Sequence, residues 1–298
     1  LRYFLAVAEE GHVTRAAERL GIQQPPLSQQ IKALEAELEV QLFHRRPRGV
    51  ELTEAGESLL IDARRILGEV EGALTRARRT ARGELGRLAV GITASAPFHP
   101  FVTRLLRDFR GANPDVSMTL EEDGTSQLAA AVQAERLDVA FVRSAPTKTD
   151  GVGFLDLLQE PMVAALPARH RLAREPRRGL KLGALAGETF ILYRRTSGPG
   201  LYDAIVGACR AAGFSPRVEQ EAPRITATLN LVAAGFGVTL VPQSLSGQQA
   251  EAIVYRPLAA APRLAAPLGL AYRRTGQTAA ASNFVALARR EAREGKGG

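Results

Sequence analysis

Three polar side chains near the start of the chain could recognise nucleic-acid bases. Ser28, Gln29 and Lys32 fall on the polar side of an expected helix whose apolar side carries Leu27 and Ile31. Residues four apart share one face of a helix, so these polar groups are expected to face solvent. A short face that is uncharged near its start and rich in hydrogen-bonding groups suits the base edges in a DNA groove.

The helix with this polar face follows another short helix after a turn. Gly21 stands where the first helix must end in a left-handed residue, which glycine adopts without Cβ strain. Pro25 and Pro26 fall in the first turn of the second helix, where a missing N–H costs nothing. Ala16 and Ala17 are small enough to let two helices cross closely. The pattern predicts a helix-turn-helix, with another kind of small helical hairpin as the alternative.

Residues 45–53 predict a β-wing next to this motif. Pro47 and Gly49 turn the chain, and the residues after the turn alternate as in a short strand. The arginines of the segment are positioned to clamp phosphates, a contact that gives affinity but no sequence information. A solvated basic loop is the alternative.

A long helix is predicted to begin after Thr53, which caps it together with Glu54. Apolar residues recur along it at alternating spacings of three and four, which is an a/d seam and predicts a coiled coil with a second chain. Packing of the helix on its own chain is the alternative. Gly83 and Gly86 are expected to end the helix. The seam consists of Leu60, Ala63, Leu67, Val70, Leu74 and Ala77.

From residue 88 onward, buried strands alternate with amphipathic helices. This alternation predicts a parallel α/β sheet. The expected strands cover residues 88–92, 116–120, 138–142, 162–166, 190–193, 217–219, 238–242 and 268–272. The expected helices cover residues 101–109, 127–134, 202–212, 227–234 and 283–290.

Charge and composition limit the class of protein. The chain has 298 residues and a net charge of +8, but residues 1–58 carry seven Lys/Arg against nine Asp/Glu. DNA binding must therefore rest on the motif and on local arginines rather than on net charge. No signal peptide is visible, and no apolar run approaches the ~20 residues that cross a bilayer. A cytoplasmic protein with no membrane partner is expected.

The residues do not assemble into a catalytic or metal-binding constellation. The four histidines show no metal-ligand spacing, and Cys209 falls within an amphipathic helix, where a core position is expected. The pair Gly235 and Gly237 follows a helix and precedes a strand, whereas a dinucleotide fingerprint needs the reverse order. We therefore expect no enzyme activity, no cofactor and no metal.

Several short motifs are typical of one protein family. They are Thr14-Arg15-Ala16-Ala17 with Leu20, Gln24-Pro25-Pro26-Leu27-Ser28, Ile31 with Leu34-Glu35, Leu42-Phe43, Leu52-Thr53-Glu54-Ala55-Gly56, Leu137-Asp138-Val139-Ala140 and Val232 to Pro242. With these motifs, the whole chain resembles the LysR-type transcriptional regulators. The resemblance implies a winged helix-turn-helix over residues 1–58, a linker helix over 59–87 and an effector domain over 88–298. The effector domain would be α/β, with subdomain I at 88–160 and 266–298 and subdomain II at 161–265, similar to periplasmic binding proteins.

This resemblance also implies partners and contact residues. Regulators of this kind bind operator DNA as homodimers or homotetramers, respond to a small coinducer and act with RNA polymerase. Gln29 replaces the arginine of many relatives, and glutamine suits adenine rather than guanine. Gln23 replaces the usual Ser or Thr N-cap of the recognition helix, a loss of about 1 kcal/mol. The residues predicted to contact DNA are Thr14, Arg15, Gln24, Pro25, Pro26, Ser28, Gln29, Lys32, Arg46, Arg48 and Thr53.

Hydroxyl groups follow the expected strands at several helix entrances, where unpaired N–H groups favour anions. Ordinary N-caps are the alternative. Arg143, at the end of its own strand, would pair with an acid or brace the wall of the cleft. The residues predicted to bind an effector are Thr93, Ser95, Thr125, Ser126, Arg143, Thr196, Ser197 and Gly198.

The predicted function is therefore a DNA-binding regulator that senses a small organic acid, the coinducer. Arg143, Gly124-Thr125 and the segment 195–199 resemble the subgroup that controls the breakdown of aromatic compounds and responds to muconate-like or benzoate-like acids. The alternative is a cytoplasmic solute-binding protein without a transcriptional role, because residues 88–298 alone would support it.

Overall fold

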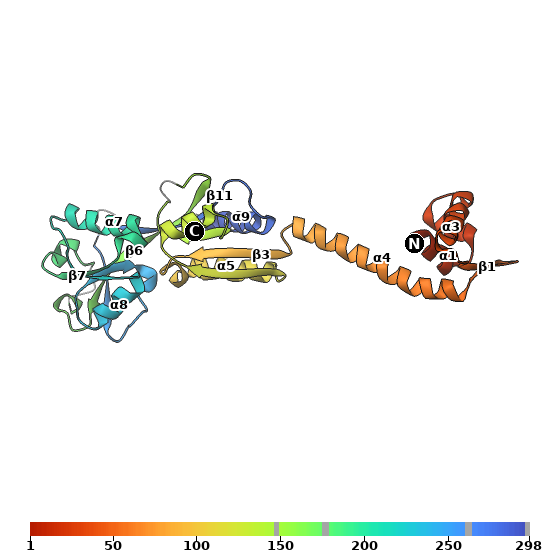
Figure 1. Cartoon of the computed structure of the whole chain (residues 1–298). Coiled ribbons are helices and arrows are strands. Elements are labelled where there is room, and N and C mark those ends of the chain that lie inside the picture. The colour runs from red at the N-terminus through yellow and green to blue at the C-terminus, as the bar shows by residue number, and fades with distance from the viewer. Residues whose placement is uncertain (146–148, 175–178, 260–263, 296–298) are drawn as a thin grey trace. The chain divides into compact units, whose positions relative to one another are not determined.

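The chain forms two compact units, Leu1–Arg79 and Thr80–Gly298. The computed structural model describes residues 1–145, 149–174, 179–259 and 264–295 (Figure 1). The N-terminal unit contains α1 (Arg2–Glu10), α2 (Val13–Leu20), α3 (Gln24–Leu38), β1 (Phe43–Arg46), β2 (Gly49–Leu52) and α4 (Glu54–Ala81), the last of which ends just beyond the unit's boundary.

The N-terminal unit is a winged helix-turn-helix, as predicted. Gly11 and Gly21 end α1 and α2 with φ angles of 60° and 67°, which place both in the left-handed region. Gln23 precedes α3 in an extended conformation and its side chain makes no capping hydrogen bond, so the predicted loss of a cap is confirmed. The shared core beneath the helices consists of Phe4, Ala6, Val7, Ala16, Ala17, Leu27, Ile31, Leu42, Phe43 and Ala63.

The C-terminal unit is an α/β structure, as predicted. It contains β3 (Gly86–Ile92), α5 (Pro100–Ala112), β4 (Val116–Glu122), α6 (Thr125–Gln133), β5 (Val139–Val142), β6 (Val152–Pro167), β7 (Thr189–Tyr193), α7 (Pro199–Ala211), β8 (Arg217–Ala222), α8 (Ile225–Ala233), β9 (Thr239–Pro242), β10 (Ile253–Pro257), β11 (Ala265–Arg273) and α9 (Ala279–Glu294).

The main sheet of this unit is mixed, so the expectation of a parallel sheet is wrong in part. Its strand order is β10-β6-β11-β5-β3-β4, and β9 also pairs with β6. β3 is parallel to β4 and β5, whereas β11 is antiparallel to both β5 and β6. β7 and β8 form a separate parallel pair. The mixture arises because the 16-residue β6 and the returning β11 lie side by side as an antiparallel pair in the middle of the sheet.

Two cores lie along β6 and β11 and define the two halves of the unit. The half that we call subdomain I is built around the first core, in which Leu157 and Leu268 pack against α5 and α9. The half that we call subdomain II is built around the second core, which contains Met162 and Ala266 together with residues of α7 and α8. The cores therefore exchange between Leu157 and Met162 on β6 and between Ala266 and Leu268 on β11.

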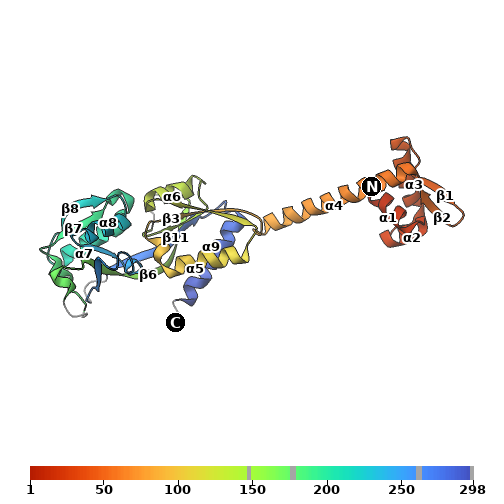
Figure 2. The same ribbon diagram turned by 90° about the horizontal axis from the view of Figure 1, so that it is seen from below.

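The sheet of subdomain I is covered on both faces. Val139 and Phe141 of β5 join the core under α5 and α9, whereas Ala140 and Val142 join a smaller core under α6. Figure 2 shows α6 on one side of β3 and β11, and α5 and α9 on the other. Burial on both faces explains why β5 is a continuous apolar run rather than an alternating one.

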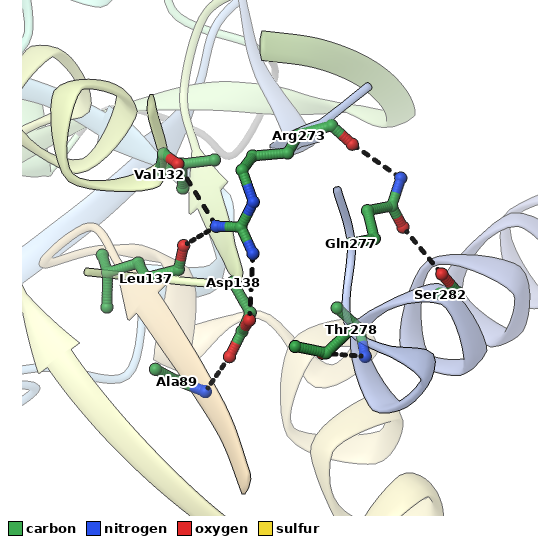
Figure 3. A network of polar contacts seen from close by, with 9 residues as sticks. Ala89, Val132, Leu137, Asp138, Arg273, Gln277, Thr278 and Ser282 are labelled. Carbon is green, nitrogen blue, oxygen red and sulfur yellow. Dashed lines mark hydrogen bonds and ion pairs between the residues drawn. The ribbon is translucent and has the colours of Figure 1, made fainter. Parts of the chain in front are cut away.

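A buried ion pair ties the C-terminal end of α6 to the sheet (Figure 3). One nitrogen of Arg273 donates to the carbonyls of Leu137 and Val132, at 2.7 and 3.3 Å, and the other to Asp138 at 3.3 Å. The second carboxylate oxygen of Asp138 accepts the N–H of Ala89 at 2.8 Å. The guanidinium thus joins the last turn of α6, through the Val132 carbonyl, to the segment that leads into β5, through the Leu137 carbonyl and Asp138.

We expect Arg273→Met to lower the free energy of unfolding by about 3–5 kcal/mol, because the change leaves the buried Asp138 carboxylate without its partner. Urea titration followed by circular dichroism measures the effect. Arg274→Met, next to it on the exposed side, is the matched control and should change stability by less than about 1 kcal/mol. Equal effects of the two variants would contradict the structural role of Arg273.

Candidate DNA-binding and ligand-binding sites

The polar face of α3 is exposed as the sequence predicts. Leu27 and Ile31 point into the core, and Gln29 and Lys32 are exposed to solvent. Ser28 is half-buried and accepts a hydrogen bond from the side chain of Gln24 at 2.8 Å.

A groove of about 250 Å³ separates α3 from the β1–β2 hairpin. Gln24, Ser28 and Lys32 line its helix wall, and Arg45 and Arg46 line its hairpin wall. Its polar rim combines hydrogen-bonding groups on one side with guanidinium groups on the other. A sugar-phosphate strand has the charge and polarity to match this rim.

The other residues predicted to contact DNA differ in whether their side chains are exposed to solvent or paired within the chain. Thr14 and Arg15 are exposed at the start of α2, and Pro25 and Pro26 are exposed at the start of α3. Arg46 pairs with Glu51 across the hairpin at 2.7 Å.

The predicted DNA contact of Thr53 does not match the hydrogen bonds that its side chain makes. Its hydroxyl donates to the carbonyl of Gln41 at 2.7 Å and accepts the N–H of Gly56 at 3.0 Å. Thr53 therefore caps α4 and holds the base of the hairpin, and its hydroxyl is engaged within the chain rather than free for DNA.

The seam of α4 divides into two parts. Ala63 is fully buried in the core of its own N-terminal unit, and Leu60 packs against the same core. The assignment of Ala63 to an interface between chains is therefore wrong, because its side chain has no exposed surface left. Further along, Val70 and Leu74 remain 45% and 44% exposed. The first apolar residues of the repeat thus pack in the chain's own core, and the later ones form an apolar stripe on α4 that the chain itself does not cover.

A cavity of about 90 Å³ lies between subdomains I and II. Of the eight residues predicted to bind an effector, six line it: Thr93, Ser95, Thr125, Arg143, Ser197 and Gly198. Ser126 and Thr196 are exposed and lie outside the lining. Lining residues that the sequence analysis did not identify include Glu122, Asp123, Ser144, Tyr193, Leu201, Pro223, Arg224 and Ile225.

Arg143 braces the wall of this cavity. Its guanidinium donates to Glu160 at 2.6 Å and to the hydroxyl and carbonyl oxygens of Ser95 at 2.9 and 3.2 Å. The other carboxylate oxygen of Glu160 accepts the N–H of Ser244 at 2.5 Å. Burial lowers the pKa of the Arg143 guanidinium, and the neighbouring Glu160 carboxylate opposes that shift. Of the two roles predicted for Arg143, the bracing one matches its contacts.

Three helices begin at the cavity. Gly124 and Thr125 open α6, Gly198 precedes α7, and Arg224 and Ile225 open α8. The first N–H groups of a helix have no partner within it and attract negative charge. The sequence analysis identified the first two entrances by their hydroxyl groups. It missed the third because Arg224, not Ser or Thr, stands there.

Three side chains, those of Thr93, Arg224 and Tyr193, add polar groups to the cavity. The hydroxyl oxygen of Thr93 is buried and has no hydrogen-bond partner within the described residues. Arg224 is exposed at the mouth and pairs with Glu122 at 2.8 Å. The Tyr193 hydroxyl donates to the carbonyl of Gly198 at 3.0 Å, and burial raises the pKa of this tyrosine well above its usual range.

The single cysteine is inert. Cys209 is fully buried in α7, and burial raises the pKa of its thiol to about 11. The residues that the structure describes contain no cluster of His, Cys, Asp and Glu able to hold a metal ion. Among these residues, too, no helix combines the length and apolar character needed to cross a bilayer.

Comparisons with known proteins agree with this architecture. Residues 1–57 match the model of the bacterial regulatory helix-turn-helix protein, lysR family, and residues 81–293 match the LysR substrate binding domain. The regulator BudR of Raoultella terrigena is 38% identical over 287 residues, which are 96% of this chain and 98% of BudR.

Solved structures match along the whole length. Full-length CbnR in complex with its target DNA has a TM-score of 0.82 at 31% identity and covers 98% of both chains. The BenM effector binding domain with its effector benzoate has a TM-score of 0.61 at 26% identity and covers 70% of this chain and 94% of that one. The fold and the relatives define a DNA-binding transcriptional regulator, not an enzyme. The chain belongs to the LysR family.

Gln29→Ala should relax the preference for one base pair by about 1–3 kcal/mol, because a bidentate contact to a base edge is lost. Arg48→Ala should instead weaken binding to all sequences alike and flatten the salt dependence. Binding to a library of duplexes at several salt concentrations separates the two effects. A Gln29→Ala variant with unchanged affinity and preference would show that α3 does not read bases through this residue.

Proposed function

We propose that this regulator senses a small organic acid in the cavity between subdomains I and II. The observation that carries the proposal is the hydroxyl of Thr93. A buried hydroxyl without a partner costs about 1–3 kcal/mol, so its place in a cavity wall indicates a missing partner. A ligand oxygen in the cavity would supply that partner.

The surroundings of Thr93 favour an anion. Arg143 is neutralised by Glu160, so the preference for negative charge comes from the N–H groups that open α6, α7 and α8. Arg224 adds a cation at the mouth, and an incoming carboxylate would compete there with Glu122. The sequence-based expectation of a carboxylate effector therefore has support from groups that the sequence analysis did not name.

Part of the cavity lining is apolar. Leu201, Pro223 and Ile225 line it together with the ring of Tyr193. A ligand with a carboxylate and a compact apolar body, such as an aromatic acid, matches both the polar and the apolar lining groups. Benzoate, the effector of BenM, is an acid of this kind. We therefore propose genes of aromatic-compound breakdown as its targets.

Ligand binding would act on the contact between the two subdomains. The two subdomains approach closely at the rim of the cavity, and we call the segments that meet there its lips. At one such place, an added Cβ on Gly124 would lie 2.4 Å from the carbonyl oxygen of Ser197. A Cβ on Gly200 would lie 2.5 Å from the Ser144 side chain. A molecule held by both subdomains would change how these lips meet, and so rotate one subdomain against the other.

The exposed stripe of α4 completes the proposal. We assign Leu67, Val70 and Leu74 to a coiled-coil contact between two chains. The two winged helix-turn-helix domains of such a dimer would each bind one half-site of operator DNA. Dimers would pair into tetramers that act with RNA polymerase. The alternative, a solute-binding protein without a transcriptional role, does not explain the winged helix-turn-helix.

Thr93→Val tests the ligand site. Valine has nearly the same shape and removes the hydroxyl, so binding of the acid should weaken about 5- to 30-fold, the loss of one buried hydrogen bond. Stability should stay the same or rise, because an unsatisfied buried hydroxyl disappears. Calorimetry with the acid that most stabilises the wild-type chain in a thermal-shift screen of acetate, benzoate and cis,cis-muconate measures the change.

Ser126→Ala is the matched control, since this exposed hydroxyl lies one residue beyond the cavity lining. Its affinity for the acid should equal that of the wild type. If no acid of the screen stabilises the wild-type chain, the proposed ligand class is wrong. If Thr93→Val binds as tightly as the wild type, the ligand occupies another place.

Leu74→Lys tests the contact between chains. A lysine in the middle of an apolar seam costs several kcal/mol, so the pair should separate and operator binding should weaken. Light scattering measures the mass of the assembly. Thr75→Lys, exposed next to the seam, should leave the mass unchanged. An unchanged mass in Leu74→Lys would mean that chains associate through another surface.

A further inference from the structure

Glu35 lies on α3 beyond the residues that face DNA, yet its carboxylate points to the wing. One oxygen accepts the N–H groups of Leu42 and Phe43, at 2.8 and 3.2 Å. Leu42 directly precedes β1, and Phe43 is its first residue. Hydrogen bonds to a carboxylate are about twice as strong as those between neutral groups. A single side chain of the recognition helix therefore fixes the start of the hairpin.

The other strand of the hairpin is held from the opposite side by backbone atoms. The N–H of Val50 donates to the carbonyl of Gly11 at 2.9 Å. Gly49 has a φ angle of 142°, and an added Cβ would lie 2.3 Å from the same carbonyl oxygen. This contact fixes β2 against the turn between α1 and α2. On the side of β1, Leu42 and Phe43 are buried in the core shared with α3, and Glu35 adds the hydrogen bonds that join the backbone of this segment directly to α3.

We propose that Glu35 is a positioning residue for DNA binding, which sets the hairpin against α3 and so fixes the width of the groove between them. Glu35 itself lines that groove, together with Lys32, Arg45 and Arg46. The two amide donors offset part of the negative potential of this carboxylate and hold it in place, although it keeps its charge. Its contribution to DNA binding is therefore to anchor the hairpin rather than to contact phosphate.

The proposal predicts that Glu35 acts through the wing arginines. Each phosphate contact contributes about 0.9 to the slope of log affinity against log salt. If Arg45, Arg46 and Arg48 all lose their phosphates when the wing is released, the slope should fall by about 2–3. This part rests on the predicted wing contacts to phosphate, whereas the anchoring itself does not.

The experiment compares full-length variants on a random-sequence 30-base-pair duplex at 50–200 mM NaCl, followed by fluorescence anisotropy. Glu35→Ala should lower the salt slope by about 2–3, because its methyl group cannot accept the two N–H groups. Glu35→Gln keeps an oxygen at the same place and should restore the wild-type slope. Glu37→Ala, exposed on the same helix, is the matched control and should also leave the slope unchanged.

Hydrogen exchange gives a readout that does not depend on DNA. The amides of Leu42 and Phe43 should exchange faster in Glu35→Ala than in the wild type, and at the wild-type rate in Glu35→Gln. Should Glu35→Ala fail to fold, Glu35→Asp replaces it, because its shorter side chain withdraws the carboxylate and should give an intermediate slope and exchange rate.

The outcomes separate anchoring from phosphate contact. Unchanged exchange and slope in Glu35→Ala would overturn the proposal. So would weaker binding at an unchanged slope, since that indicates a general loss of stability. Faster exchange at an unchanged slope, with Arg48→Ala also unchanged, would show that Glu35 anchors a wing that makes no phosphate contacts, and its role in DNA binding would be refuted.

Discussion

The C-terminal unit depends on the buried pair of Arg143 and Glu160. Arg143 directly follows β5 in subdomain I, and Glu160 lies in β6 where the two cores exchange. Through Ser95 on one side and Ser244 on the other, the pair connects both subdomains at the floor of the cavity. Burying two charges is expensive unless every contact is made. The pair therefore favours one geometry of the junction between the subdomains.

The helix-turn-helix could be predicted because its local signals agree. Gly21 at a helix end, two prolines in a first turn and an apolar face at helical spacing all favour the same structure. The length of β6 could not be predicted, because Gln159, Glu160 and Pro161 interrupt its apolar pattern. Glu160 is tolerated there only through Arg143, a partner that spacing in the sequence does not reveal.

In the candidate sites, too, some residues could be located from the sequence and others could not. Thr93, Ser95 and Thr125 could be located because hydroxyl groups at strand ends and helix starts have a known use. Arg224 was missed because arginine at a helix start carries no such signal. The pattern of α4 could not tell the chain's own core from a partner, since Ala63 and Leu74 fit the same seam but only one of them is buried within the chain.

The contact between Gly124 and Ser197 bears on how such a regulator changes over generations. The approach is between backbone atoms, so one codon change that gives Gly124 any side chain forces the lips apart. The hydroxyl groups inside the cavity are not part of this contact, and small side chains can be exchanged there without touching it. Under the proposed function, the choice of ligand would thus depend in part on positions such as Thr93 and Thr125 that lie apart from the Gly124 contact, and mutation could alter one property while the other persists.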